Sequence, residues 1–148
     1  MPQVKSETIV NAPLEKVYAI AKDPERFPEL MEDVESVKIL EREENAQVVE
    51  WVGIVPQFHR RVHWIERDEW DDSDHTCRFI MTEGDFDKYE GTWAFERTSG
   101  NTLMKLSFNY EFNIPLIGPL IQKVVLNAVQ GNADGMLAGI KAAAEHDE

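Results

Sequence analysis

The sequence predicts an α+β fold, in which a seven-stranded antiparallel sheet packs against one long C-terminal helix. Three observations predict it: a series of closely spaced strand-like segments, an N-terminal strand followed by two short helices, and a long amphipathic segment at the end of the chain. The chain has 148 residues, which is the length of one domain, and it contains no repeat or linker. We therefore expect a single domain over residues 1–148.

The N-terminal part predicts one strand and two short helices. Residues 3–11 carry several β-branched side chains and predict a strand. Asn11 is a suitable N-cap for a helix over residues 14–22. A second short helix is expected to start at Pro24 and to end near Pro28, because proline is tolerated only in the first turn of a helix.

The middle of the chain predicts six further strands. They cover residues 34–42, 47–55, 58–70, 76–83, 86–97 and 102–113. Short turn-rich segments separate them, so we expect sequential hairpins, that is, an antiparallel meander. The acidic run over residues 68–74 has no calcium-loop spacing, and we interpret it as a charged turn.

Alternation along the last two strands predicts one aromatic and one wet face. Side chains two residues apart share a face of a strand. Tyr89, Trp93 and Phe95 therefore lie opposite Lys88 and Glu90. The next strand repeats the pattern, since its apolar side chains alternate with polar ones: Met104, Leu106, Phe108, Tyr110 and Phe112. Such a sheet is buried on one face only.

Residues 116–145 predict a long helix with one broad apolar face, and Asn132 lies near the middle of that face. A buried asparagine must find hydrogen bonds, so Asn132 either bonds to the protein or faces a ligand pocket. Gly131, Gly135 and Gly139 recur every fourth residue, although each costs about 1 kcal/mol relative to alanine in a helix interior. Either the helix packs closely there, or the missing side chains leave room for a ligand.

Composition and charge exclude some partners. Asp and Glu outnumber Lys and Arg by 28 to 15, and the net charge is −13. Nucleic acids and anionic membrane surfaces would repel such a chain. The single cysteine, Cys77, has no partner for an intrachain disulfide, and we find neither a signal peptide nor an apolar run long enough for membrane insertion. We expect a cytoplasmic protein, and the oligomeric state stays open.

Two groups of residues identify a family resemblance. The first is Asn11-Ala12-Pro13 followed by the segment Asp23-Pro24-Glu25-Arg26-Phe27-Pro28, and the second is Gly84-Asp85-Phe86 followed by Gly91-Thr92-Trp93-Ala94-Phe95. Together they resemble the START/Bet v1-like (SRPBCC) superfamily, and most closely its polyketide cyclase/dehydrase and coenzyme-Q-binding branch. The resemblance covers nearly the whole chain. It implies a helix-grip fold, in which the curved sheet wraps around the C-terminal helix with a pocket between them.

In such a pocket, apolar side chains would contact a ligand and a few polar groups would orient it. The candidate ligand-binding residues are Trp51, Tyr89, Trp93, Phe95, Phe108, Tyr110, Val124, Ala128, Asn132 and Gly135. The aromatic residues among them are equally typical of a plain core.

Arg61 and His63 are the candidate catalytic residues, because they share one face of their strand. An arginine there would stabilise an enolate, and a histidine would act as acid or base. The resemblance favours Arg61, since aromatase/cyclases often carry an arginine on a corresponding strand. Val62 and Trp64 compete for the inward face, however, and a shift of one residue reverses the assignment.

Three functions fit these observations. The first is binding of a small hydrophobic ligand such as a lipid, quinone or polyketide-like compound. The second is a polyketide cyclase, aromatase or dehydratase acting on a poly-β-ketone, so whether the chain is an enzyme stays open. The third is a protein-interaction module of the ribosome-associated START-like type. No nucleotide-binding or metal-binding motif is present, and we expect neither a cofactor nor a metal.

Overall fold

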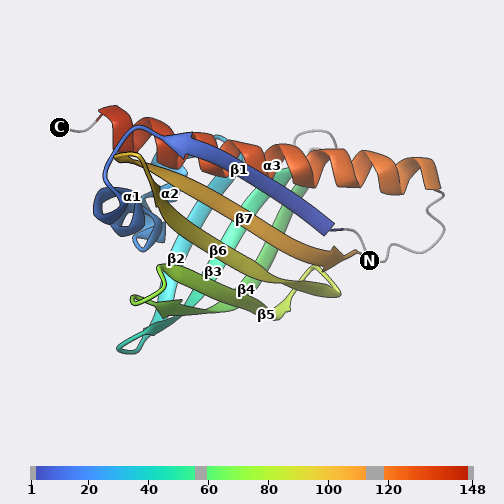
Figure 1. Cartoon of the computed structure of the whole chain (residues 1–148). Coiled ribbons are helices and arrows are strands. Elements are labelled where there is room, and N and C mark those ends of the chain that lie inside the picture. The colour runs from blue at the N-terminus through green and yellow to red at the C-terminus, as the bar shows by residue number, and fades with distance from the viewer. Residues whose placement is uncertain (1–2, 56–59, 113–118, 147–148) are drawn as a thin grey trace.

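One antiparallel sheet curves around a long helix in the computed structural model, which describes residues 3–55, 60–112 and 119–146 (Figure 1). The sheet has seven strands in the order β1-β7-β6-β5-β4-β3-β2. Their bounds are β1 Gln3–Val10, β2 Val34–Arg42, β3 Ala46–Val55, β4 Arg60–Asp71, β5 Thr76–Gly84, β6 Lys88–Thr98 and β7 Asn101–Glu111. Strands β2 to β7 form the predicted meander, and β1 adds to its β7 edge.

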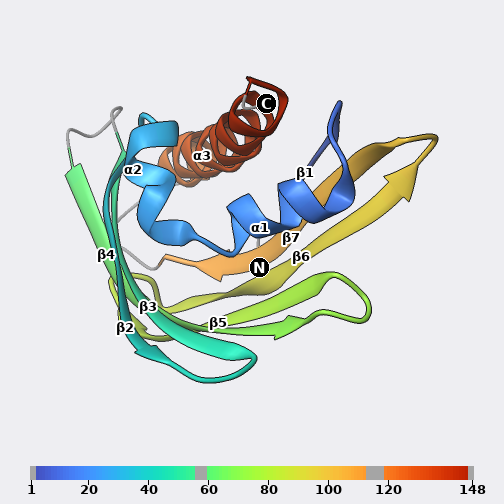
Figure 2. The ribbon, with the colours of Figure 1, turned by 90° about the vertical axis from the view of Figure 1, so that its left-hand side faces the viewer.

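Three short helical segments and one long helix accompany the sheet. They are α1 Leu14–Ala21, η1 Pro24–Arg26, α2 Phe27–Leu30 and α3 Pro119–His146. All four lie on the concave side of the sheet (Figure 2). The expected helix start at residue 116 falls outside the described residues, as do the expected strand ends at residues 58, 59 and 113.

The prediction that Asn11 caps α1 is wrong. The residue before the first helical turn is Pro13, which is extended and gives no side-chain cap. Asn11 lies two residues too early, and its backbone N–H donates a hydrogen bond of 2.7 Å to Glu145 Oε2. The first turn of α1 therefore starts without the side-chain cap that the sequence suggested.

Bulges and one glycine bend the sheet. The pairing register shifts at two places between β2 and β3 and once between β4 and β5, where Thr82 of β5 is skipped. A bulge bends its strand and increases the local twist. Gly84, at the end of β5, pairs with Trp64 and has φ +152°. A Cβ atom there would lie 2.5 Å from Trp64 Cβ, so only glycine lets the two strands approach at this bend.

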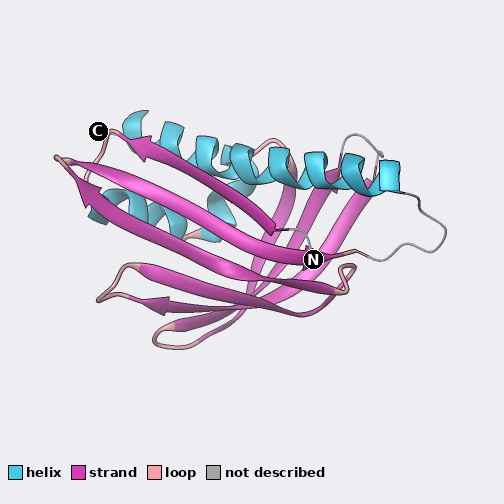
Figure 3. Ribbon diagram, turned by 45° about the vertical axis from the view of Figure 1, so that its right-hand side comes forward, coloured by secondary structure: helices cyan, strands magenta, loops and turns pink. Residues whose placement is uncertain are grey.

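Helix α3 runs alongside β1 (Figure 3), and polar side chains connect the two. Ser6 Oγ donates to Asp134 Oδ1 at 2.6 Å, and Gln130 Nε2 donates to the Lys5 carbonyl at 3.0 Å. Further along, Lys141 Nζ donates to the Ile9 carbonyl at 2.7 Å. These contacts fix one flank of α3 against the β1 edge, so its other flank faces α2, β2 and β3 across the concave side of the sheet.

The core lies between α3 and the concave face. Alternate residues of β6 and β7 are buried there as predicted, with Phe95, Met104 and Leu106 among the least exposed. The interpretation of residues 68–74 as a charged turn is wrong at its start, because β4 continues to Asp71 and Asp68 points inward, with 6% of its surface exposed. No described helix is long and apolar enough to cross a membrane.

Candidate functional site

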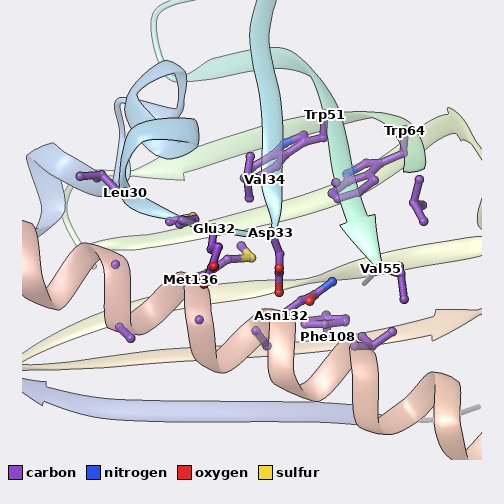
Figure 4. Close-up of a pocket in the computed structure, with 18 of the residues that line it drawn as sticks. Leu30, Glu32, Asp33, Val34, Trp51, Val55, Trp64, Phe108, Asn132 and Met136 are labelled. Carbon is purple, nitrogen blue, oxygen red and sulfur yellow. The ribbon is translucent and has the colours of Figure 1, made fainter. Parts of the chain in front are cut away.

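A cavity of about 420 Å³ lies between the sheet and α3 (Figure 4). The link between α2 and β2, the ends of β3 and β4 and one flank of α3 supply its lining. Most of the lining is aliphatic or aromatic, including Val34, Val55, Val62, Val129 and Met136. Because β1 holds the opposite flank of α3, the cavity lies on the side where no strand covers the helix.

Five aromatic side chains line this cavity: Trp51, Trp64, Phe86, Tyr89 and Phe108. Trp51 and Trp64 are cross-strand partners whose rings stack with centroids 5.5 Å apart and planes 6° apart. The Tyr89 ring lies 5.3 Å from Trp64 and 5.0 Å from Phe108. Packing between neighbouring rings holds each of them in place, so the aromatic surface is formed before any ligand enters.

Polar side chains of the cavity gather at one place. Glu32 and Asp33 come from the link between α2 and β2, and Asn132 comes from α3. Figure 4 shows the Asp33 carboxyl group and the Asn132 amide directed toward one another. Burial, followed by the charge of Glu32, raises the pKa of Asp33. Asn132 thus faces the cavity, which was one of its two predicted roles.

Two buried carboxyl groups lie on the inner face of β4, next to the aromatic surface. Glu66 is 5% exposed and Asp68 is 6% exposed; we call these residues the acid pair. Trp64 Nε1 donates a hydrogen bond of 2.8 Å to Glu66 Oε1. Burial raises the pKa of both carboxyl groups, and the charge of Glu66 raises that of Asp68 further. Because two adjacent buried carboxylates repel each other, the pair retains a proton at pH values well above the usual pKa of a carboxyl group.

Tyr89 lies in the cavity lining, and the charges of the acid pair act on its phenol group. Its side chain lines the cavity and is 7% exposed. Burial raises the pKa of the Tyr89 phenol well above its usual value, and the charges of Glu66 and Asp68 add to the rise. The phenol therefore stays protonated at neutral pH and is able to donate a hydrogen bond to a ligand oxygen.

The three glycines of α3 differ in their surroundings. A Cβ atom on Gly139 would lie 2.5 Å from the Leu30 carbonyl oxygen, so this glycine permits close packing of α3 on α2. A Cβ atom on Gly131 or Gly135 would meet nothing within 4 Å. Gly135 and Gly139 both line the cavity. Of the two interpretations of this pattern, close packing holds at Gly139 and open space holds at Gly135.

Half of the candidate ligand-binding residues line the cavity: Trp51, Tyr89, Phe108, Asn132 and Gly135. The expectation that the other half would line it is wrong. Trp93, Phe95, Tyr110 and Ala128 are buried, and Val124 is partly buried, but none of these five is among the lining residues. They share the inner side of the sheet or a flank of α3 with the lining residues, at positions further from the cavity.

Arg61 and His63 face away from the cavity, so of the two orientations of this strand that the sequence left open, the one that would give them a catalytic role does not hold. Arg61 is 72% exposed at its side chain, and its Nε lies 2.8 Å from Glu35 Oε1. His63 Nε2 lies 2.8 Å from Glu50 Oε2. The register of β4 turns the competing set, Val62 and Trp64, toward the core.

Sequence reasoning missed the acid pair and the two acidic residues of the cavity, Glu32 and Asp33. Alternation from Trp64 would have placed Glu66 and Asp68 on the inner face, since all three have the same parity along β4. No such signal exists for Asp33, because it lies in the link before β2, where its backbone carbonyl accepts a hydrogen bond of 2.8 Å from the Ile54 N–H of β3.

Comparison with known proteins identifies the family. Residues 10–137 match the model of the family described as polyketide cyclase / dehydrase and lipid transport. The chain belongs to this family. No curated protein matches the sequence.

Solved structures of the same fold agree with this assignment. A protein of Thermus thermophilus is 38% identical, with a TM-score of 0.90 over 95% of this chain and 94% of that chain. The Zhui aromatase/cyclase of a Streptomyces species is 18% identical, with a TM-score of 0.90 over 98% and 94%. A STAR-related lipid transfer protein of Xanthomonas axonopodis is 12% identical, with a TM-score of 0.74 over 93% and 84%. The fold is the helix-grip fold of START/Bet v1-like proteins, as the resemblance implied.

Proposed function

We propose that the chain binds a small hydrophobic molecule, such as a lipid, quinone or polyketide-like compound, between the sheet and α3. The observation that carries this proposal is a cavity of about 420 Å³ whose described lining is mostly aliphatic and aromatic. Ligand sites in proteins typically measure ~300–1,000 Å³ and combine such a lining with a few polar groups. The family description, which includes lipid transport, supports the same function.

A matched pair of glycine variants tests this proposal. Gly135→Trp adds an indole at the cavity lining, whereas Gly131→Trp adds it on the same helix outside that lining. We expect wild type and Gly131→Trp to bind the neutral dye Nile red, and Gly135→Trp to bind it at least about tenfold more weakly, a loss of ~1.4 kcal/mol. Fluorescence titration measures this difference. Native mass spectrometry of protein from its own host shows whether a natural compound is retained.

The proposal fails if wild-type protein neither retains an apolar compound nor binds Nile red. It also fails if both tryptophan variants bind the dye as tightly as wild type, because binding would then occur elsewhere. Circular dichroism confirms that each variant is folded before its affinity is compared.

A second candidate function is cyclisation or dehydration of a poly-β-ketone. The observation that favours it is the protonated Tyr89 phenol in the cavity lining, electrostatically coupled to the acid pair. In this function the cavity would fold the substrate, and Tyr89 would donate a hydrogen bond to the enolate oxygen as it forms.

Tyr89→Phe tests this second function, because it removes only the hydroxyl group. We expect turnover of a soluble poly-β-ketone mimic to fall by roughly 100-fold, within the range for loss of a proton donor. Tyr18→Phe is the control, since its hydroxyl bonds to Asp72 away from the cavity lining. Binding of the mimic without turnover by wild type would leave ligand binding as the function and exclude this cyclisation.

A further inference from the structure

The described lining of the cavity has acidic and aromatic groups but no basic one. Its charged side chains are those of Glu32 and Asp33, and no lysine, arginine or histidine of the described residues belongs to the lining. Arg61 and His63 of β4 lie on the outer face and pair with Glu35 and Glu50. The charged side chains in the described lining are therefore all negative.

On the basis of the proposed ligand-binding function, we propose that the occupant is an amphiphile whose polar end is cationic, an amine or a quaternary ammonium ion. Asp33 and Asn132 would hold this polar end, because their polar groups are directed toward one another at one place in the cavity (Figure 4). The apolar part would lie against the aromatic surface.

Asp33 is suited to pair with a cation. It is partly buried, and its side chain has no hydrogen bond to any described residue. Burial penalises the charged form of this carboxyl group and raises its pKa. A bound ammonium group offsets that penalty, whereas a ligand carboxylate would increase it. Asn132 adds an amide oxygen, which accepts a hydrogen bond from an amine.

The aromatic lining favours the same charge. The faces of indole, phenol and phenyl rings carry negative electrostatic potential and attract cations within about 6 Å of the ring centre. Five such rings line the cavity, and two of them, Trp51 and Trp64, present a stacked pair. Indole binds cations best among the aromatic side chains.

The acid pair disfavours anionic ligands. Trp64, whose ring lines the cavity, donates its N–H to Glu66, so the acid pair lies one hydrogen bond behind the lining. A carboxylate or phosphate taken out of water needs a cationic or hydrogen-bonding partner. The described lining offers such a group no cation, and its charged neighbours are all acidic.

Three amphiphiles with the same chain and different polar ends test the proposal: decyltrimethylammonium, decanol and decanoate. Calorimetric titration at physiological salt measures their affinities for the wild-type protein below the concentration at which they aggregate. We expect decyltrimethylammonium to bind at least about tenfold more tightly than decanoate, with decanol between them.

Two variants that each remove one negative charge test whether the cation is bound by the cavity or is attracted by the overall negative charge of the protein. Asp33→Asn removes the carboxylate of the cavity, and Glu35→Gln removes one on the outer face of β2 that pairs with Arg61. We expect Asp33→Asn to weaken decyltrimethylammonium by about tenfold and Glu35→Gln to leave it nearly unchanged. Asn132→Asp adds a carboxylate at the same place and should increase the affinity for decyltrimethylammonium. This variant provides a readout if Asp33→Asn does not fold.

The possible outcomes distinguish this inference from the function on which it rests. Decanoate or decanol binding as tightly as the cation would overturn the cationic ligand while leaving hydrophobic binding intact. Equal weakening by Asp33→Asn and Glu35→Gln would overturn it as well, since the attraction would come from total charge. If none of the three amphiphiles binds and Nile red does not bind either, the proposed function itself fails.

Discussion

At the scale of single residues, burial of the acid pair carries a desolvation cost. Glu66 and Asp68 are almost fully buried on one face of β4, and neither forms an ion pair with a described residue. Buried carboxyl groups avoid their desolvation cost by keeping a proton, so the raised pKa values follow from the position of these two side chains. The hydrogen bond from Trp64 accounts for one oxygen of Glu66, and Asp68 Oδ1 has no partner among the described atoms.

The acid pair predicts a pH dependence of stability. Because the pKa values are higher in the folded than in the unfolded chain, the folded state binds more protons above the ordinary carboxyl pKa values. The contribution of the pair is fully present below those values and is lost as the pH rises through the raised pKa values. Glu66→Gln imitates the protonated form of the side chain. Between about pH 5 and about pH 9 we therefore expect the free energy of unfolding of this variant to fall less than that of wild type, with a difference of roughly 1 kcal/mol or more.

Urea unfolding at several pH values measures this difference. The control is Glu69→Gln, which removes an exposed carboxylate on the outer face of the same strand. Parallel pH profiles for wild type and Glu66→Gln would contradict the prediction and would mean that the pair titrates as it does in water.

At the scale of elements, α3 combines two requirements along one helix. Its β1 flank is fixed by hydrogen bonds to the Lys5 and Ile9 carbonyls, and its other flank leaves space for the cavity. Gly135 and Gly139 both border the cavity, and Gly139 in addition lies close to the Leu30 carbonyl oxygen of α2. A residue type that weakens a helix therefore has different surroundings at positions four residues apart.

Alanine substitutions test the different surroundings of the three glycines of α3. Gly131→Ala and Gly135→Ala should each raise the free energy of unfolding by up to about 1 kcal/mol, since alanine is the better helix former and its Cβ meets nothing. Gly139→Ala should lower it, because its Cβ would lie 2.5 Å from the Leu30 carbonyl oxygen. Thermal and urea unfolding compare the three variants. Stabilisation by Gly139→Ala equal to that of the other two would refute the packing role.

At the scale of the whole molecule, the fold could be predicted much further than the site. Strand periodicity and turn residues gave the seven strands nearly at their observed bounds, because the burial of one sheet face requires alternation in any such sequence. The helix cap at Asn11 and the inclusion of Asp68 in a charged turn were wrong, since the residue before α1 is Pro13 and Asp68 pairs with Gln47 of β3.

The site depends on contacts between segments that lie far apart along the chain. Asn132 and Gly135 were identifiable from their own helix, because a polar or missing side chain within an apolar face is visible in the periodicity. The orientation of Arg61 and His63 stayed open, because alternation fixes which residues share a side and not which side is buried. Asp33 had no periodic signal at all.

The sequence by itself determined the strand and helix order, the aromatic face and the family, since each follows from local patterns that any chain of this class must carry. Only the tertiary structure decided which face of β4 is buried, which aromatic residues border the cavity, and that Asp33 and Asn132 both line it. The physical reason is that a cavity is the space left between elements. Its shape and charge depend on sheet curvature and on the placement of α2 and α3, which no single segment encodes.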